Sequence, residues 1–304
     1  MRHRIDPKVD CVFKALLGAE PNRNLLAHFL NAVLANELSA PITAVDILNP
    51  YSDPESLDDK LSIVDVKAED QQGRIYQIEI QLAIHRHLPA RMLYTWADLY
   101  SQQLSSGEDY GQLRPTYAIW LLAENLIKGD ADYARDYQLR DQRGHGLIAH
   151  GGIWLLELQK YAGEPIETEQ QRWLKFFKEG ERLDDGQLPD WMNTDEMRQA
   201  MNTLRQFSEK ERDYHAYQAR QNYLREQRAI QKEREEIQKE LEQERQEKQA
   251  ALQEKQAALQ EKQAALQREE TALQREETAL QREETALQEI EQLKALLSDK
   301  SDPM

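Results

Sequence analysis

A repeat with a period of seven residues occupies 246–287 and constrains this chain more than any other feature. The unit QEKQAAL occurs three times and is followed by three copies of QREETAL. An apolar residue at every seventh position is typical of a long helix with a coiled-coil seam. We therefore expect one continuous helix over about 208–297, roughly 130 Å long at about 1.5 Å per residue.

The seam of this helix is weak. One leucine of each unit lies on a common line; these are Leu252, Leu259, Leu266, Leu273, Leu280 and Leu287. The second core position of each heptad holds Gln, Lys or Glu, where a stable coiled coil has another apolar residue. Leu241 and Leu252 lie eleven residues apart, so the seam changes phase just before the repeats. We expect a rod or a weak homo-oligomerisation element.

The composition changes near residue 220. No aromatic residue follows Tyr223, whereas aromatic and apolar residues sufficient for a core precede it. We therefore predict a main domain over 1–165, a small helical extension over 166–220 and a long helix with a weak coiled coil over 221–298.

The net charge restricts the partners of the chain. It is −16, and because 14 Lys+Arg and 20 Asp+Glu follow residue 220, the front part still has 25 basic and 35 acidic residues. Nonspecific affinity for nucleic acid comes from neutralising phosphates with Lys and Arg. Any contact with DNA must therefore use a local basic patch or bound metal ions.

Cysteine content and hydropathy indicate the compartment. The single cysteine, Cys11, excludes an intrachain disulfide framework and a Cys-rich zinc site, and we expect it in the core. The segment 1–17 interleaves charges with apolar residues, unlike a signal peptide, and no long apolar span occurs elsewhere. These features predict a soluble cytoplasmic protein without a membrane segment.

Helical and strand patterns alternate through the front part. Asp6-Pro7 is typical of a helix start, and helical spacing of apolar residues continues to Leu17. A second helix is expected from about Asn22. Strands are expected over 42–48, 61–69, 74–82, 116–123, 133–139 and 153–158, with a helix over 87–105 and interrupted helices over 167–209. On the helix over 87–105 and at its exit, we expect Tyr94, Trp96, Tyr100 and Tyr110 in the core.

The strands over 61–69 and 74–82 form a predicted hairpin. A three-residue loop that ends in glycine suits a type I turn closed by a left-handed residue, here Gly73. If Asp70 pairs with Arg74, then Asp65 pairs with Glu79. Opposite residues have Cβ atoms about 4.5–5.5 Å apart, so both carboxylates could reach a common ion.

Two interpretations of this hairpin face remain open. In the first, it is an exposed polar face on which Lys67 relieves the repulsion between the acids. In the second, it is a magnesium site, because Mg²⁺ takes oxygen ligands and tolerates one or two protein carboxylates. Such an ion polarises a phosphate and lowers the pKa of an attacking water.

Several spaced motifs carry a resemblance over roughly residues 4–215. They are IDPKVDCVFKALLG, ILNPY, DVKAEDQQGRIYQIEIQ, RMLYTWADLYSQQLSSGEDY and WLLELQK. In this order they resemble the transposases and recombination-promoting nucleases of the PD-(D/E)XK nuclease family. The resemblance implies an α/β fold, a restriction-endonuclease-like core with a mixed sheet flanked by helices.

The resemblance also implies site residues. Asp65 stands at the motif aspartate, Glu79 at the motif glutamate, and the backbone carbonyl of Ile80 is expected to add a metal ligand. Gln81 stands where most members of the superfamily have lysine, and it can hydrogen-bond a water or a phosphate but brings no charge.

Three further residues are candidates for the same site. Lys67 is expected to supply the missing charge, or it is a solvated strand lysine. Arg91 is expected to contact the scissile phosphate, or it forms an ion pair on the helix surface. Asp10 either touches the metal or pairs with Lys14.

The resemblance therefore implies an enzyme, a Mg²⁺-dependent (or Mn²⁺-dependent) DNA endonuclease that hydrolyses phosphodiester bonds in mobile-element, recombination or phage-defence contexts. DNA and further copies of the chain are the expected partners. The alternative is a catalytically degenerate nuclease fold that acts as a DNA- or protein-interaction scaffold through its long coil. The acidic front part and Gln81 favour this alternative.

Overall fold

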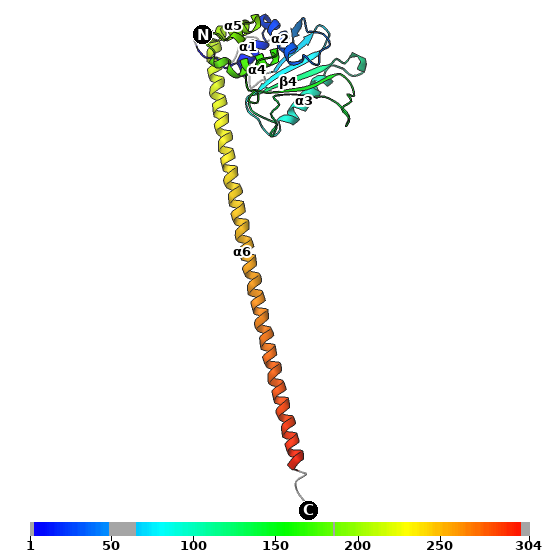
Figure 1. Ribbon diagram of the computed structural model, residues 1–304, viewed down its shortest axis with the longest axis vertical. Coiled ribbons are helices and arrows are strands. Elements are labelled where there is room, and N and C mark those ends of the chain that lie inside the picture. The colour runs from blue at the N-terminus through cyan, green and yellow to red at the C-terminus, as the bar shows by residue number, and fades with distance from the viewer. Residues whose placement is uncertain (1–2, 49–64, 185, 299–304) are drawn as a thin grey trace, which may run out of the picture. The chain divides into compact units, whose positions relative to one another are not determined.

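A computed structural model of the protein describes residues 3–48, 65–184 and 186–298 (Figure 1). The chain divides into two compact units, Met1–Arg225 and Glu226–Met304. The first unit contains a six-stranded sheet with its covering helices, and the second is formed by most of one long helix.

The sheet of the first unit is mixed. Its strands are β1 (Val45–Ile47), β2 (Asp65–Asp70), β3 (Ile75–Gln81), β4 (Thr116–Leu122), β5 (Ala134–Tyr137) and β6 (Gly151–Glu157), in the order β1-β2-β3-β4-β6-β5. The three central strands β3, β4 and β6 run parallel to one another. The flanking strands are antiparallel to their neighbours. Every residue of β4 is buried, because helices cover both faces.

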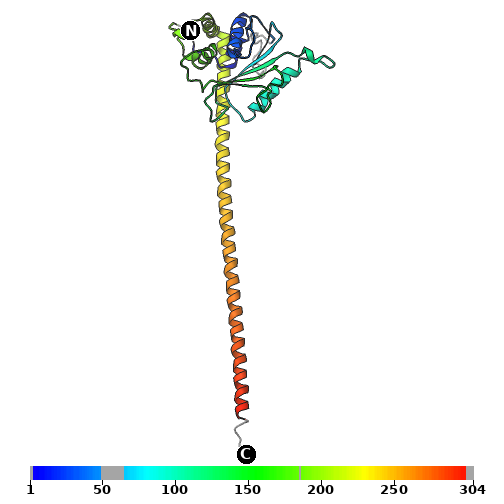
Figure 2. The same cartoon turned by 45° about the vertical axis from the view of Figure 1, so that its right-hand side comes forward.

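The helices lie on opposite sides of the sheet (Figures 1 and 2). They are α1 (Asp10–Leu17), α2 (Arg23–Val33), α3 (Leu88–Ser101), α4 (Glu169–Glu179) and α5 (Asp195–Glu209). Short 3₁₀ turns occupy Glu20–Asn22, Tyr110–Gln112, Gly180–Arg182 and Asp190–Met192. One face of the sheet packs with α1, α2, α4 and α5 in a large apolar cluster. The other face packs with α3 in a smaller cluster that contains Leu88, Met92 and Trp120.

The helices that follow the sheet share its larger core. Trp173, Phe176 and Phe177 of α4 are fully buried. The rings of Trp173 and Phe29 are 5.6 Å apart, and those of Phe177 and Phe13 are 5.5 Å apart. A capping box formed by Thr168 and Gln171 begins α4. The extension thus packs on the sheet unit, while the domain limits at 165 and 220 stay predictions.

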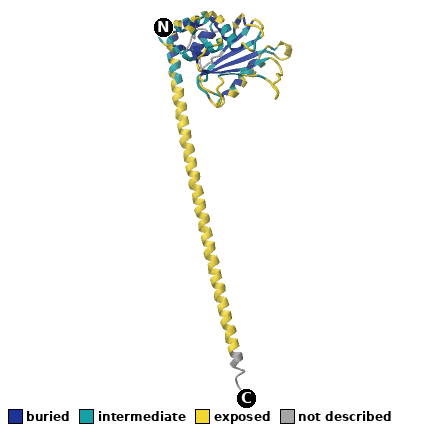
Figure 3. Ribbon diagram, viewed as in Figure 1, coloured by how far each residue is buried: buried dark blue, intermediate teal, exposed yellow. Residues whose placement is uncertain are grey.

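Helix α6 (Glu211–Ser298) contains the heptads. It is one helix of 88 residues, as the periodicity predicted. Figure 3 shows that its residues are exposed along the heptad repeats, whereas buried residues gather in the sheet and the helices α1 to α5. Within the part of the chain that the structure describes, no helix combines the length and hydrophobicity that a membrane span requires.

The predicted start of the first helix is wrong by about three residues. Helix α1 begins at Asp10, after Val9 in an extended conformation. Asp6 accepts a hydrogen bond from the amide of Lys8 (2.9 Å), and its own amide donates to the Tyr217 hydroxyl (3.2 Å). Lys8 Nζ donates to the carbonyl of Phe177 (3.1 Å). These contacts hold Asp6-Pro7 in a turn.

The aromatic residues around α3 are only partly placed as predicted. Trp96 is half-buried and donates from Nε1 to the carbonyl of Thr116 (3.0 Å), and the Tyr100 hydroxyl bonds His150 Nδ1 (2.8 Å). Tyr94 and Tyr110, in contrast, are 71% and 80% exposed, so their prediction as core residues is wrong. Tyr94 lies on the outer side of an amphipathic helix that buries Leu88, Met92 and Leu99.

Candidate active site

The hairpin of β2 and β3 has the predicted turn and register. Gly73 has φ +76°, its amide donates to the carbonyl of Asp70 (2.9 Å), and the amide of Asp70 donates to the carbonyl of Arg74 (3.1 Å). The Asp70 carboxylate accepts bonds from the amides of Gln72 and Arg74, from the Arg74 guanidinium (2.6 Å) and from the Tyr76 hydroxyl (2.7 Å). From this turn, the strands pair so that Asp65 lies opposite Glu79.

Glu79 is a buried carboxylate with two nearby donors. Its side chain is 3% exposed. Gln77 Nε2 donates to Oε1 at 2.7 Å, and the Arg91 guanidinium donates to Oε2 at 2.9 Å. A buried carboxylate keeps its charge only where opposite charge and hydrogen bonds replace the lost water. Arg91 supplies the charge and Gln77 supplies a bond.

Arg91 reaches Glu79 because α3 crosses the same face of the sheet. The helix anchors there through Leu88 and Met92, which are buried, and Arg91 lies between them in sequence. The guanidinium carbon lies 5.4 Å from the centre of the Trp120 ring, which favours a cation–π contact. The Arg91 side chain remains 33% exposed, so part of it is accessible to solvent.

The prediction that the polar face of this hairpin is exposed is wrong at the centre of the hairpin. Gln77 and Glu79 are each only 3% exposed, because α3 and the β4 side chains cover this face. The simple surface ion pair expected as the alternative for Arg91 is also inaccurate, since its partner is a buried strand carboxylate. Glu79 thus lies buried between a guanidinium and an amide.

The other predicted residues surround Glu79. Lys67 is half-buried and lies opposite Gln77 in the strand register. Gln81 is half-buried at the end of β3, where its Nε2 donates to the carbonyl of Ala83 (2.9 Å). Ile80, between Glu79 and Gln81, packs against the larger core with its side chain. Their catalytic roles stay predictions.

The residue that pairs with Asp10 is not Lys14, the residue that the sequence suggested as the alternative to a metal ion. Its carboxylate pairs with Arg220 of α6 and accepts the amide of Cys11 (2.8 Å). The expected pair with Lys14 is therefore replaced by a contact with a residue more than two hundred positions away. Helix α1 belongs to the layer on the opposite face from α3. A role of Asp10 as a metal ligand stays a prediction.

The residues fit a hard divalent cation in their chemistry. Asp65 and Glu79 stand opposite each other in the register, and all expected donors are oxygens, as Mg²⁺ prefers. Glu79 pairs with the Arg91 guanidinium at 2.9 Å, and a positive neighbour favours the deprotonated form that a metal ligand must have. Among the side chains that the structure describes, which do not include that of Asp65, no three His, Cys, Asp or Glu residues group closely enough to hold a metal.

His85 reports on the electrostatics beside the site. It lies between β3 and α3, and its pKa is lowered, first by partial burial and second by the positive charge of Arg91. His87 adds a smaller effect in the same direction. The imidazole therefore stays neutral to lower pH than an ordinary histidine, and it adds no positive charge at neutral pH.

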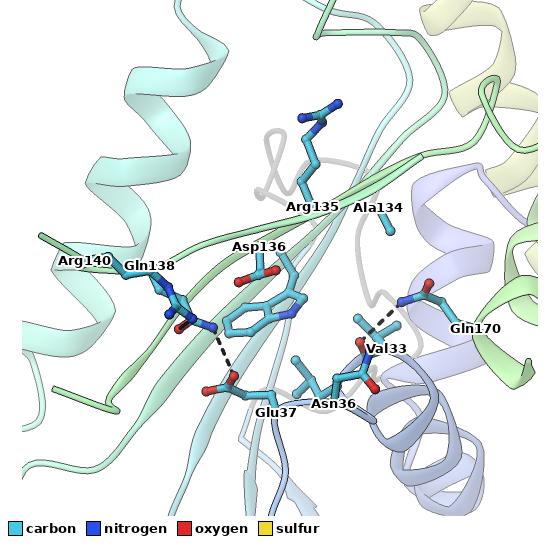
Figure 4. A pocket seen from close by; sticks show the side chains of 11 residues that line it. Val33, Asn36, Glu37, Ala134, Arg135, Asp136, Gln138, Arg140 and Gln170 are labelled. Carbon is cyan, nitrogen blue, oxygen red and sulfur yellow. Dashed lines mark hydrogen bonds between the residues drawn. The ribbon is translucent and has the colours of Figure 1, made fainter. Parts of the chain in front are cut away.

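A separate pocket of about 360 Å³ lies on the α2 side of the sheet (Figure 4). Its lining includes Glu37, Gln138, Asp136 and Trp154, and Gln138 Nε2 donates to Glu37 (3.0 Å). Trp154 belongs to the larger core, so this pocket opens on the face opposite to Glu79 and Arg91. It is distinct from the candidate active site.

Two neighbours of Glu79 were not predicted as site residues. Gln77 precedes Glu79 by two positions on the same strand, so strand alternation was the available signal. Trp120 comes from β4, directly opposite Glu79 in the parallel register. No local signal in the segment 116–122 reveals this pairing, because parallel neighbours are set by the crossover between the strands.

Comparison with known proteins agrees with this geometry. A family model described as PD-(D/E)XK nuclease family transposase matches residues 7–234. Comparisons with curated proteins and with solved structures gave no significant match. The match covers the mixed sheet, the hairpin and α3, and the chain belongs to the PD-(D/E)XK nuclease family transposases.

Proposed function

We propose that the chain is a divalent-metal-dependent DNA endonuclease whose active site is formed by Asp65 and Glu79. The observation that carries this proposal is the strand pairing of Asp65 with a buried Glu79, which Arg91 and Gln77 hold in place. Membership in a nuclease-type family supports DNA as the substrate.

Each residue has a defined task in this proposal. Asp65, Glu79 and the carbonyl of Ile80 hold Mg²⁺ or Mn²⁺, with Asp10 as a further candidate ligand. The bound ion supplies Lewis acidity towards the scissile phosphate and lowers the pKa of a water. Arg91 presents the solvent-accessible part of its side chain to a phosphate oxygen, and bidentate guanidinium–phosphate contacts are strong.

Gln81 and Lys67 share the work of the usual motif lysine. Gln81 orients the attacking water through its amide, and Lys67 contributes positive charge from the neighbouring strand. If so, Gln81→Lys retains or raises the cutting rate, whereas Gln81→Ala lowers it. A Lys67→Ala variant that cuts as fast as the parent would remove Lys67 from the site.

Cutting of supercoiled plasmid tests the proposal. The protein should nick plasmid with Mg²⁺ or Mn²⁺ and stop in EDTA. Asp65→Asn and Glu79→Gln should each lose at least about a hundredfold in rate, because each removes a charge that positions the ion. Glu69→Gln is the matched control, since it removes the same charge from the same hairpin. Undiminished cutting by Asp65→Asn contradicts the site assignment.

One observation favours a second candidate function, a non-catalytic scaffold. Both oxygens of Glu79 already accept hydrogen bonds, and Gln81 brings no charge to the site. Calorimetry distinguishes the two functions. Heat on titration with Mg²⁺ or Mn²⁺ that disappears in Glu79→Gln supports the metal site, and the lack of any such heat supports the scaffold.

The proposed setting is the reducing cytoplasm, in accord with a single cysteine. Self-association through α6 is part of this proposal.

A further inference from the structure

The exposed leucines of α6 form a seam that has no partner within the described chain. The six repeat leucines are between 56% and 61% exposed. They recur at an interval of seven residues, so they lie along one line of the helix. A line of regularly spaced leucines on an otherwise polar helix is a surface for another helix.

The charges beside this seam invert halfway along it. In the first block, 246–266, the residue three positions after a seam leucine is lysine, as in Lys255 and Lys262. In the second block, 267–287, the residues three positions before and after a leucine are glutamates, such as Glu270 and Glu277. The two blocks have equal length, and the residue three positions after a leucine is positive in the first block and negative in the second.

From this complementarity we infer that α6 pairs with α6 of a second copy in the antiparallel direction, so that the first block of one chain faces the second block of the other. Leu252 then lies opposite Leu287, Leu259 opposite Leu280, and Leu266 opposite Leu273. Because the two chains run in opposite directions, the positions three residues after a leucine lie on the same side of the seam in both chains, so that Lys255 lies beside Glu283 and Lys262 beside Glu276.

A parallel, in-register pair is disfavoured by the same charges. It sets Lys255 against Lys255, Lys262 against Lys262, and the glutamates of the second block against themselves. Like charges at core-flanking positions oppose pairing and select against that orientation. The antiparallel pair has like charges in one central layer, at Glu269 and Glu270, where Arg268 of both copies lies nearby in sequence.

A parallel pair shifted by three heptads also matches opposite charges, but it leaves one block of each chain uncovered. Such a head-to-tail contact continues into an open filament. The antiparallel pair is two-fold symmetric and covers all six leucines of both chains, so it closes as a dimer. Its consequence is that the two copies of residue 226 are separated by roughly 130 Å along the paired helices, at about 1.5 Å per residue.

Spin-label distances in the full chain distinguish these arrangements. Single cysteines at Gln253, Gln267 or Gln288 are introduced into a Cys11→Ala background. The antiparallel dimer predicts roughly 50–55 Å between labels at Gln253 or at Gln288 and a short distance at Gln267, from about 1.5 Å per residue. Short distances at all three sites, or about 30 Å at all three, overturn the inference, as does a monomer at micromolar concentration.

Charge reversal provides an independent test. Lys255→Glu with Lys262→Glu should weaken dimerisation about tenfold or more, because each new glutamate faces a glutamate of the partner. Adding Glu276→Lys and Glu283→Lys in the same chain should restore it. Lys232→Glu with Lys239→Glu, outside the repeats, is the control of equal net charge. A parallel in-register dimer is insensitive to the first pair of changes, and that result contradicts the inference.

Discussion

At the scale of single residues, the Glu79–Arg91 ion pair contributes to the stability of the fold and belongs to the proposed active site. Glu79 is nearly inaccessible to water, and Arg91 is two-thirds covered. Breaking such a pair leaves an uncompensated charge inside the protein, which costs more than the intact pair contributes. The Arg91 side chain is also one-third exposed, and in the proposed function it contacts a phosphate, so its loss should affect both properties.

We expect Arg91→Met to lower the free energy of unfolding by about 2–3 kcal/mol, because the Glu79 carboxylate stays buried without its cation. Glu79→Gln combined with Arg91→Met should recover part of this loss, since the buried charge is then absent. Urea unfolding of the two single variants and the double variant measures the coupling. A coupling of zero contradicts the pairing of these two side chains.

The histidine beside the site provides a probe that does not depend on activity. Burial and the charge of Arg91 both lower the pKa of His85, because each disfavours the imidazolium. His85 should therefore protonate at a lower pH than an ordinary histidine, and Arg91→Met should raise its pKa partway back. Because the native state disfavours protonated His85, this histidine does not lower the free energy of unfolding at neutral pH. It lowers that free energy as the pH falls from the ordinary histidine pKa towards the lower pKa of the native state.

Histidine chemical shifts followed by NMR between pH 4 and 8 test this expectation. The signal of the exposed His145 serves as the control. An unchanged titration of His85 in the variant would mean that Arg91 does not lie beside it.

At the scale of elements, the turn of the β2–β3 hairpin determines which residues face one another. Gly73 has φ +76°, a conformation that residues with a Cβ rarely adopt. A slip of one residue would carry Glu79 to the other face of the sheet. The turn therefore positions the acids although it lies at the far end of the hairpin.

Gly73→Ala should lower the free energy of unfolding by about 1 kcal/mol, and Gly73→Asn by less, because asparagine tolerates the left-handed region. Gly146→Ala is the control, since a Cβ at Gly146 meets open space and its φ is not positive. Thermal or urea unfolding measures all three. A Gly73→Ala variant as stable as the parent contradicts the turn conformation.

Local patterns predicted the elements well where burial is periodic along the chain. The hairpin register followed from one turn, and α3 and β4 followed from their apolar spacing. The strand predicted over 42–48 is shorter, Val45–Ile47, because the Asn31 side chain bonds both the amide and the carbonyl of Ile42 (2.8 Å each). The burial of Glu79 under α3 was not predictable, because tertiary packing decides it. The segment 61–64 lies outside the described residues.

At the scale of the whole molecule, segments of the first unit that are far apart in the sequence pack against its amino-terminal helix. Helices α4 and α5 share the core of α1, and Arg220 of α6 pairs with Asp10. Cys11 is next to this ion pair and is partly buried, less than its prediction as a core residue implied. Access to its thiol therefore depends on separating segments that are far apart in the sequence.

The reactivity of Cys11 should report the opening of the whole first unit. Burial, and secondly the charge of Asp10, raise the pKa of this thiol from 9.0 to about 12. At pH 8 the native protein then carries about a thousandfold less thiolate than the unfolded chain, and thiolate is the reacting species. Because the native state holds this proton more tightly, stability should fall as the pH rises from about 9 to about 12.

Labelling with a chromogenic disulfide at pH 8 measures this directly, because the chain has one cysteine. The native protein should react far more slowly than the unfolded protein, and the rate should rise with denaturant in parallel with unfolding. Asp10→Asn should speed native labelling, since it removes the second cause of the raised pKa. Native labelling within about tenfold of the unfolded rate would show that α1 opens without the rest of the unit.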